Sequence, residues 1–354
     1  MAWKGFNTIC GVAKATTWGT PVAVGTGHQI YIVSESLTPD AQLIPNNSLT
    51  GTPFQPAGDK GNEFHSGDLV CEADYDTVHR LLALAMGTAG TPAQPTSDLA
   101  FVHTLRMAAS IEGIFSTLVL GSIGEFVREY TTAKHNGFNF SIENGQRLQA
   151  TFPVIPQGLN INTASGTNEL TSLPNITLPT NANTARPIFN HLRVFVNNFD
   201  GADFDTSVGS ADEVYVSSLS LEVPGAFPTD DVTTRYAPLI DEPIRDGFVL
   251  PTGTLSMSKL TTSARIAEML SKAKKKALLQ FTGPVANGIT TYSLKVFLSD
   301  VQFSGGSFNV GGPQRVPEEI NFQAGLPTAA HTGFAFADAI YITITNQQST
   351  DPLA

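Results

Sequence analysis

Three carboxylates close together, Asp200, Asp203 and Asp205, are the best candidates for metal chemistry in this 354-residue sequence. Clustered oxygen ligands in the segment Asp200-Gly201-Ala202-Asp203-Phe204-Asp205 are the kind that Ca²⁺ binds. The segment lacks the glycine at position six and the closing glutamate of an EF-hand loop. An acidic turn between strands explains the same residues more simply, so we predict no metal site.

A group of basic residues, Lys272, Lys274, Lys275 and Lys276, suggests a contact with phosphate. No aromatic side chains lie between these lysines to stack on bases, as single-stranded nucleic-acid sites require. A run of charge at the end of a helix is usually a solvated face. We favour a contact with an acidic patch of a neighbouring subunit over a contact with DNA.

Pairs of adjacent carboxylates, Asp230-Asp231 and Glu318-Glu319, suit general acid–base catalysis poorly, because neighbouring side chains on a strand point to opposite faces. The seven histidines form no HxH or HExxH spacing. The sequence contains no GxSxG elbow, P-loop or GxGxxG segment that opens a helix. We therefore predict a protein that is not an enzyme and has no catalytic, cofactor-binding or metal-binding residues.

The composition indicates a protein with an unusually neutral surface. Charged residues make up 14% of the chain, apolar residues 41%, and the net charge is −11. This acidic balance argues against a nucleic-acid-binding protein, and the scarcity of charge suits faces that are covered by copies of the same chain. Cys10 and Cys71 set no disulfide framework, and no signal peptide or apolar run of about 20 residues is visible. We expect a soluble protein that assembles in a reducing compartment.

The elements that position these residues occur twice in the same order. Segment Ile30–Leu37 matches Val214–Leu219 at a spacing of 184 residues, and Gly67–Cys71 matches Gly253–Met257 at 186. A helical apolar stripe follows each match, at a spacing of 188. The two stripes are Val78, Leu81, Leu82 and Ala85, and then Ile266, Met269, Leu270 and Ala273. We predict two copies of one unit, each with a helix capped near Thr77 or Ser263, the first ending at Gly87.

Between these helices and the chain ends, apolar residues alternate as in half-buried strands. The alternating rows are Phe138–Ile142, Leu148–Phe152, Tyr292–Leu298, Ile320–Ala324 and Ile340–Ile344. A two-residue turn at Asn144-Gly145 would place the first two rows on opposite faces. We therefore predict a register that pairs Ile142 with Leu148 through a longer loop or a bulge.

Two turn-rich segments, Leu37–Ser66 and Pro224–Pro251, occupy equivalent places in the two copies. Loops of this length are uncommon in compact domains and are often functional, so we interpret them as arms that reach a neighbouring subunit. The Asn-, Thr- and Pro-rich stretch from Gly158 to Pro187 is the expected connection. The predicted domains are 1–160 with an N-terminal arm, a linker over 161–187, and 188–354 with a C-terminal strand.

The N-terminal segment Gly11-Val12-Ala13-Lys14-Ala15-Thr16-Thr17-Trp18-Gly19-Thr20-Pro21-Val22, followed by Ser34-Glu35-Ser36-Leu37, resembles a signature of siphophage tail-tube proteins. The blocks Gly67–Gly87 and Gly137–Phe152 are similar to later parts of that family. The resemblance implies a mainly β (α+β) chain of two duplicated sandwich or half-barrel units, each with a flanking helix. It further implies that the inner sheets of several subunits join into a closed barrel ring on oligomerisation and that rings stack through long loops.

This resemblance predicts a structural virion protein that polymerises into the tail tube through which DNA passes without specific binding. Two units per chain would make a ring of three chains with pseudo-six-fold symmetry, or else a true hexamer. Expected partners are further copies of the chain and the tape measure, terminator and distal tail proteins, with no membrane and no cofactor. The expected location is the virion tail, after assembly in the host cytoplasm. The alternatives are a tail terminator or completion ring and a carbohydrate-binding adhesin module; Trp3 and Trp18 lie too close to the N-terminus to suggest a saccharide platform.

Overall fold

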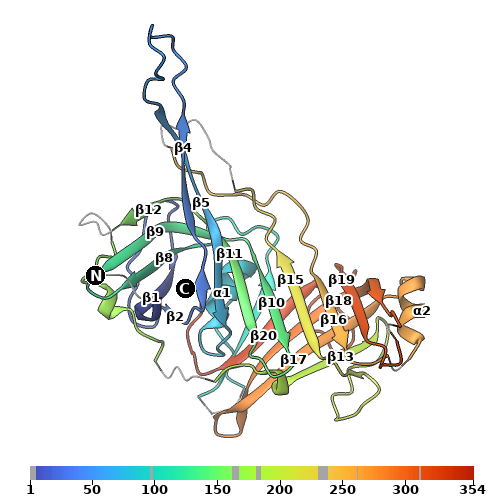
Figure 1. Ribbon diagram of the computed structural model, residues 1–354. Coiled ribbons are helices and arrows are strands. Elements are labelled where there is room, and N and C mark those ends of the chain that lie inside the picture. The colour runs from blue at the N-terminus through green and yellow to red at the C-terminus, as the bar shows by residue number, and fades with distance from the viewer. Residues whose placement is uncertain are drawn as a thin grey trace.

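The computed structural model describes residues 5–95, 99–161, 167–180, 185–229, 238–260, 262–310 and 312–354. It confirms a mainly β chain with two α-helices, arranged as a broad sheet backed by further strands (Figure 1). The strands before the middle of the chain are β1 Thr8–Ala15, β2 Gln29–Ile30, β3 Ser34–Glu35, β4 Thr38–Ile44, β5 Asp59–Glu72, β6 Gly87–Thr88, β7 Phe101–Met107, β8 Phe115–Ser122, β9 Phe126–His135, β10 Gly137–Glu143, β11 Gln149–Pro156 and β12 Leu159–Ile161. The later strands are β13 Leu192–Asn198, β14 Glu213–Val214, β15 Ser218–Pro224, β16 Thr252–Met257, β17 Lys275–Asn287, β18 Thr290–Ser307, β19 Glu318–Ala324 and β20 Ile340–Asn346. The helices are α1 Val78–Met86 and α2 Ala264–Ser271, with short 3₁₀ turns at Gly5–Asn7, Leu173–Asn175 and Phe189–His191.

One antiparallel sheet runs through both parts of the chain, in the order β3/β4, β5, β11, β10, β15, β16, β19 and the end of β18. We call it the inner sheet. Figure 1 shows β5, β11, β10, β15 and β16 side by side across the molecule. The pairing of β10 with β15 joins strands from the two parts of the chain, and the inner sheet is not closed within one chain.

Further strands form two outer sheets that back the inner one. The first outer sheet has the order β2, β1, β8, β9, β12, and the second has the order β14, β13, β17, β18, β20, β7, β6. The predicted alternation is confirmed here: Tyr292, Leu294 and Val296 of β18 are buried in the main apolar core. Burying one face of each strand contributes the main stabilisation of such layers.

The pairings in the two parts of the chain share their registers. Cys10 pairs with Ile30 in β1–β2, and Val194 pairs with Val214 in β13–β14, so both positions shift by 184 residues. Ser34 pairs with Val70 in β3–β5, and Ser218 pairs with Ser256 in β15–β16, at shifts of 184 and 186. Thr8–Ser122 in β1–β8 recurs as Leu192–Phe281 in β13–β17, at shifts of 184 and 159. Constant shifts in separate ladders mean that the same strand arrangement occurs twice.

Two ladder irregularities also recur. The β8–β9 register shifts between Ser116–Ala133 and Leu118–Tyr130, and β17–β18 shifts between Lys275–Val301 and Ala277–Leu298, which are the same positions at shifts of 159 and 168. The register changes between His135–Val154 and Asn139–Thr151, and again at the matching place after Phe303–Phe322. Bulges bend a strand, and here each lies where a long strand passes from an outer sheet into the inner sheet.

The first helix follows the prediction closely. Thr77 is its N-cap residue, and Gly87 ends it with a φ of 83°, a left-handed conformation that favours glycine. A Cβ atom at Gly87 would also collide with Ile111. All of α1 except Arg80 is buried, so the helix is part of the core.

The second helix corrects the prediction. It begins after Ser263 as expected, but it ends at Ser271 with Lys272 in the left-handed conformation, so Ala273 lies outside it. None of its residues is buried, and Leu270 is 75% exposed. The predicted stripe therefore packs only through Ile266 and Met269, because no further strands cover α2 as β6 and β7 cover α1.

The predicted hairpin register is confirmed. Phe140 pairs with Ala150 and Ser141 with Gln149, which places Ile142 opposite Leu148. Arg147 uses its position at the turn to bind Glu72 of the adjacent β5 rather than Glu143, with a distance of 2.7 Å from Nη1 to Oε2.

The two predicted arms differ from each other. The first is a long hairpin of β4 and the start of β5, and it projects away from the sheets (Figure 1). The described part of the second, residues 224–229 and 238–251, lies instead against the first part of the same chain, where Ile240 accepts a hydrogen bond from the Trp18 indole. The described part of the predicted linker, 167–180, also packs there, with Leu173 and Ile176 buried beside Val24.

Candidate functional site: the open face of the inner sheet

The open face of the inner sheet consists of side chains that alternate with core residues along each strand. Ladder registers align them in rows that cross both parts of the chain. One row is Glu72, Gln149, Ser141, Ser220, Thr254 and Asn321. The next row is Val70, Thr151, Asn139, Glu222, Thr252 and Gln323. A third row is Glu143, Ser218, Ser256 and Glu319.

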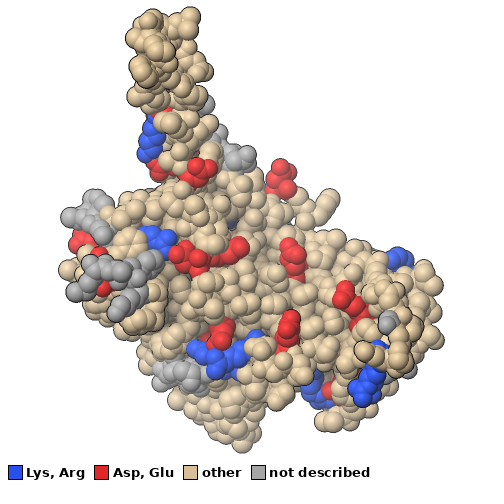
Figure 2. Space-filling view, in the orientation of Figure 1, with Lys and Arg blue, Asp and Glu red and all other residues tan. Residues whose placement is uncertain are grey.

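The chemistry of these rows is uniform. Their residues are hydroxyl, amide, glutamate and one valine side chains, and no lysine or arginine occurs among them. The space-filling view of this side shows acidic residues scattered over a largely uncharged surface, with basic residues mostly near its margins (Figure 2). A surface of this composition repels phosphate and offers it no cation to bind.

Both edges of the inner sheet end in strand backbone. At one end, β3 and β4 pair with β5 on one side only, and within the described residues no strand covers their other side. All seven residues of β4 are exposed. At the other end, Phe303–Ser307 of β18 pair with β19, and in the part of the chain described here no strand pairs with the opposite side. Uncovered edges of this kind are templates for another strand.

The lysine group is placed differently from the prediction. Lys276 lies in β17, is fully buried, and donates hydrogen bonds from Nζ to the carbonyl oxygens of Gly201 (3.1 Å), Ala202 (2.8 Å) and Thr332 (2.8 Å). Burial lowers the pKa of Lys276, and the carboxylates of Asp203 and Asp212 oppose that shift. Lys274 binds Asp300, and Lys275 binds Glu268 at 2.6 Å. These lysines form contacts within the chain, so they are not a solvated helix end.

The acidic loop at Asp200–Asp205 is held by the same lysine. The Nζ atom of Lys276 already satisfies two of the carbonyl oxygens of this loop, Gly201 and Ala202. Asp203 accepts the backbone N–H of Phe204, and Asp205 accepts that of Ser207. Across the described residues, His, Cys, Asp and Glu side chains form no group of three that could hold a metal.

The remaining candidates are separated. Glu318 is buried and accepts a hydrogen bond from Arg265 at 2.9 Å, whereas Glu319 is exposed on the open face, as adjacent residues on a strand should be. Asp230, Asp231 and Trp3 lie outside the described residues. Trp18 packs edge to face on Phe115 and is half-buried, so it is not part of a saccharide platform.

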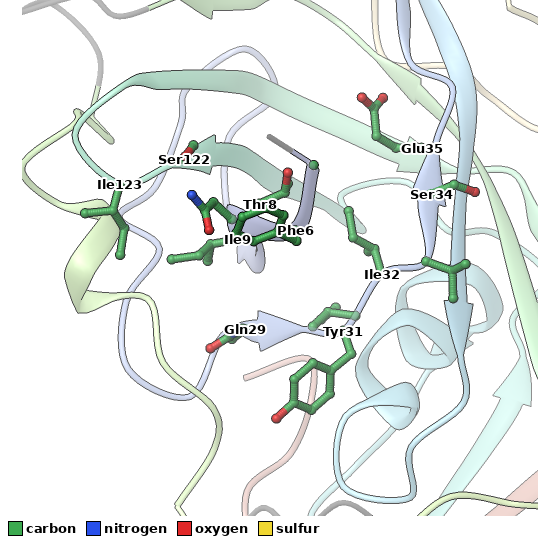
Figure 3. Close-up of a pocket in the computed structure, with 14 residues that line it drawn as sticks. Phe6, Thr8, Ile9, Gln29, Tyr31, Ile32, Ser34, Glu35, Ser122 and Ile123 are labelled. Atoms are coloured by element: carbon green, nitrogen blue, oxygen red, sulfur yellow. The ribbon is translucent and has the colours of Figure 1, made fainter. Parts of the chain in front are cut away.

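The largest hollow, about 1020 Å³, lies beside β1, β2 and β3. Figure 3 shows Phe6, Ile9 and Ile32 around its centre, with Gln29 and Glu35 toward its rim. Its one carboxylate, Glu35, forms an ion pair with Arg128. A single committed carboxylate supplies no acid–base pair, so the hollow has no catalytic arrangement.

These features are those of a structural β-sheet protein whose edges remain available for further strands. The chain matches a family described as phage tail tube protein over residues 5–324, which is nearly its whole length. The chain belongs to this family, and it is therefore a structural component of a phage tail. No curated protein matches it. No helix among the described residues is long and apolar enough to cross a membrane.

The open face and the free edges were not identified from the sequence. Each row of the face combines residues from five or six strands, and the central contact, β10 with β15, joins segments about 80 residues apart. The available signal was the alternation of Ser, Thr, Asn and Glu with apolar residues in β10, β15 and β19.

Proposed function

We propose that this chain polymerises into stacked rings that form the hollow tail tube, with the open face of the inner sheet lining the lumen and DNA passing along it. The observation that supports this proposal best is the absence of lysine and arginine from the three described rows of that face. A lumen lined with carboxylates and neutral polar groups lets a polyanion move without being trapped.

The recurring registers support a second part of the proposal, that the chain is two copies of one unit. Each copy supplies four inner strands, β3/β4, β5, β11 and β10 in the first and β15, β16, β19 and the end of β18 in the second. Three chains would then close a ring with pseudo-six-fold symmetry. With strands about 4.8 Å apart and tilted by about 45°, twenty-four strands make a barrel roughly 50 Å across its backbone. Such a bore is wider than a DNA duplex.

The projecting hairpin of β4 and β5 supports the stacking of rings. Its described residues include the exposed apolar side chains Leu43, Ile44, Leu49 and Phe54. Apolar side chains on a protruding arm lower the free energy when a partner covers them. We propose that this arm contacts the adjacent ring and that the tube contacts the tape measure, terminator and distal tail proteins at its ends.

Negative-stain electron microscopy of the purified chain at high concentration tests this function directly. Hollow tubes or stacked rings are the expected result, and rotational averages with three-fold symmetry would distinguish a trimer of duplicated chains from a hexamer. Single closed rings that never stack would favour the terminator alternative. A chain that stays monomeric and binds labelled glycans would favour the adhesin alternative.

The role of the open face can be tested by changing its charge. Glu222→Lys combined with Ser220→Lys places cations in two adjacent rows, so tubes of this variant should retain DNA at low salt and release it as salt rises. The matched control is Glu125→Lys in the β8–β9 turn, which is exposed and outside the open face. DNA retention by wild-type tubes, or equal retention by the control, would contradict the assignment of the lumen.

A further inference from the structure

The junction between the two parts of the chain provides a template for the junction between chains. Within one chain, β10 adds to the outer side of β15, with Phe140 opposite Leu221 and Ser141 opposite Ser220. The residues equivalent to β10, at the shift of 168, are Gly305–Val310. The residues equivalent to β15, at the shift of 184, are Ser34–Asp40. Both equivalents lie on the uncovered edges of the inner sheet.

We propose that Gly305–Val310 of one chain pairs, antiparallel, with Glu35–Asp40 of a second copy of the chain. This inference rests on the proposed tube and specifies its register. Transferring the β10–β15 register gives Ser307 opposite Thr38, Phe308 opposite Leu37 and Asn309 opposite Ser36. A shift of one residue would place Phe308 on the wrong face, so the buried side of the sheet fixes the register.

The side chains on both edges suit this pairing. Leu37 belongs to the apolar core and Phe308 packs against that core, as Leu221 and Phe140 do at the internal junction. Val310 is 73% exposed in the single chain and occupies the position equivalent to Ile142, which is 2% exposed. On the opposite face, Thr38 and Ser307 are exposed polar residues that continue the neutral surface of the sheet.

The backbone of the receiving edge is prepared for the new strand. The N–H of Ser36 donates to the carbonyl of Asp68 in β5, so Ser36 and Thr38 point their backbone groups inward. Glu35, Leu37 and Pro39 therefore direct theirs outward, toward the incoming strand. Pro39 has no N–H, so the junction between chains forms one hydrogen bond fewer than the internal one, where Val223 stands at this position.

Disulfide cross-linking tests this register. Ser307 and Thr38 form a non-hydrogen-bonded pair, in which the Cα atoms are close enough for a disulfide. In one chain these residues lie seven strands apart, roughly 34 Å along the sheet, so any disulfide must join two chains. The native Cys10 and Cys71 are buried, and burial raises the pKa of the Cys71 thiol to about 12, which keeps it unreactive.

The experiment oxidises the Thr38→Cys/Ser307→Cys variant under assembly conditions and measures cross-linked species on a non-reducing gel. The matched control, Ser36→Cys/Ser307→Cys, moves one thiol by two positions on the same exposed face and should cross-link about tenfold less. Dimers and a closed cross-linked ring in the first variant alone would support the register. Tubes or rings without this preference would overturn the register and leave the proposed function standing. Failure of the wild-type chain to assemble under any condition would overturn both.

Discussion

The strands from Thr8 to Ile161 and those from Leu192 to Asn346 pair in the same registers, yet their two helices have different surroundings. Helix α1 is followed by β6 and β7, and β7 joins the outer sheet that carries β20. Helix α2 leads within a few residues into β17, and nothing in the described part of the chain covers its outer side to the same extent. Backbone pairing has been retained in both parts, whereas the connections and the residues that cover the helices have changed.

The largest effect is expected where the internal junction is compared with the junction proposed between chains. Phe140→Asp places a carboxylate in a site that is 1% exposed, and it should cost more than about 4 kcal/mol and unfold the chain. Phe308→Asp, at the equivalent position, should leave a folded monomer that no longer assembles. Circular dichroism melts measure the first effect and electron microscopy the second. Normal tubes from Phe308→Asp would break the comparison.

A smaller effect is expected from neighbouring lysines of the second part. Lys276→Met leaves three carbonyl oxygens without their cationic donor, so it should lower the free energy of unfolding by about 3 kcal/mol. Lys274→Met is the matched control: its side chain is 52% exposed and its partner Asp300 keeps a 3.0 Å contact with His331. That change should cost at most about 1 kcal/mol in urea unfolding. Equal losses would mean that the buried lysine contributes nothing special.

The smallest effect concerns His135, which stands where the second part has Phe303. Burial, and then the charge of Lys134, lower the pKa of His135 to about 3. Between pH 6.5 and 3 the unfolded chain therefore binds a proton that the folded chain does not, and stability falls as pH falls, by up to about 1.4 kcal/mol per pH unit. His135→Phe should remove this contribution, so the variant loses about 2 kcal/mol less than the wild type between pH 7 and pH 5.

The control for this prediction is His191→Phe, since His191 is less buried and its pKa is lowered by burial alone. Urea midpoints measured from pH 7 to pH 5 give the comparison. If both variants keep the wild-type pH dependence, the buried histidine is not a source of acid sensitivity, and the difference between His135 and Phe303 has no energetic consequence.

Local pattern predicted the elements that local physics decides. The alternation around Phe138–Phe152 gave the correct register, and the stripe of Val78, Leu81 and Leu82 gave the first helix and its end at Gly87. The same reasoning failed for Leu270 and for Lys276, because exposure and burial there depend on segments far away in the sequence. Apolar spacing predicts a helix face, but it does not say whether another strand lies close enough to cover it.

The open face could be predicted only in composition. An acidic and weakly charged chain favoured a surface that does not bind nucleic acid, but the position of each glutamate required the strand order. Glu222 faces outward because Leu221 and Val223 are buried, which follows from alternation. That it lies beside Asn139 follows from the long-range pairing of β10 with β15, for which no motif exists.

The contact between β10 and β15 also affects how a ring would begin. Because one peptide chain carries both partners, this junction closes at the effective concentration of a tethered segment, on the order of millimolar, and not at that of free subunits. A ring of three chains then has only three junctions that depend on encounter in solution. Initiation thus loses less translational and rotational entropy than it would from six separate subunits. The alternate junctions, freed from identity with one another, can also differ in strength, so a ring opens where Pro39 stands and remains intact elsewhere.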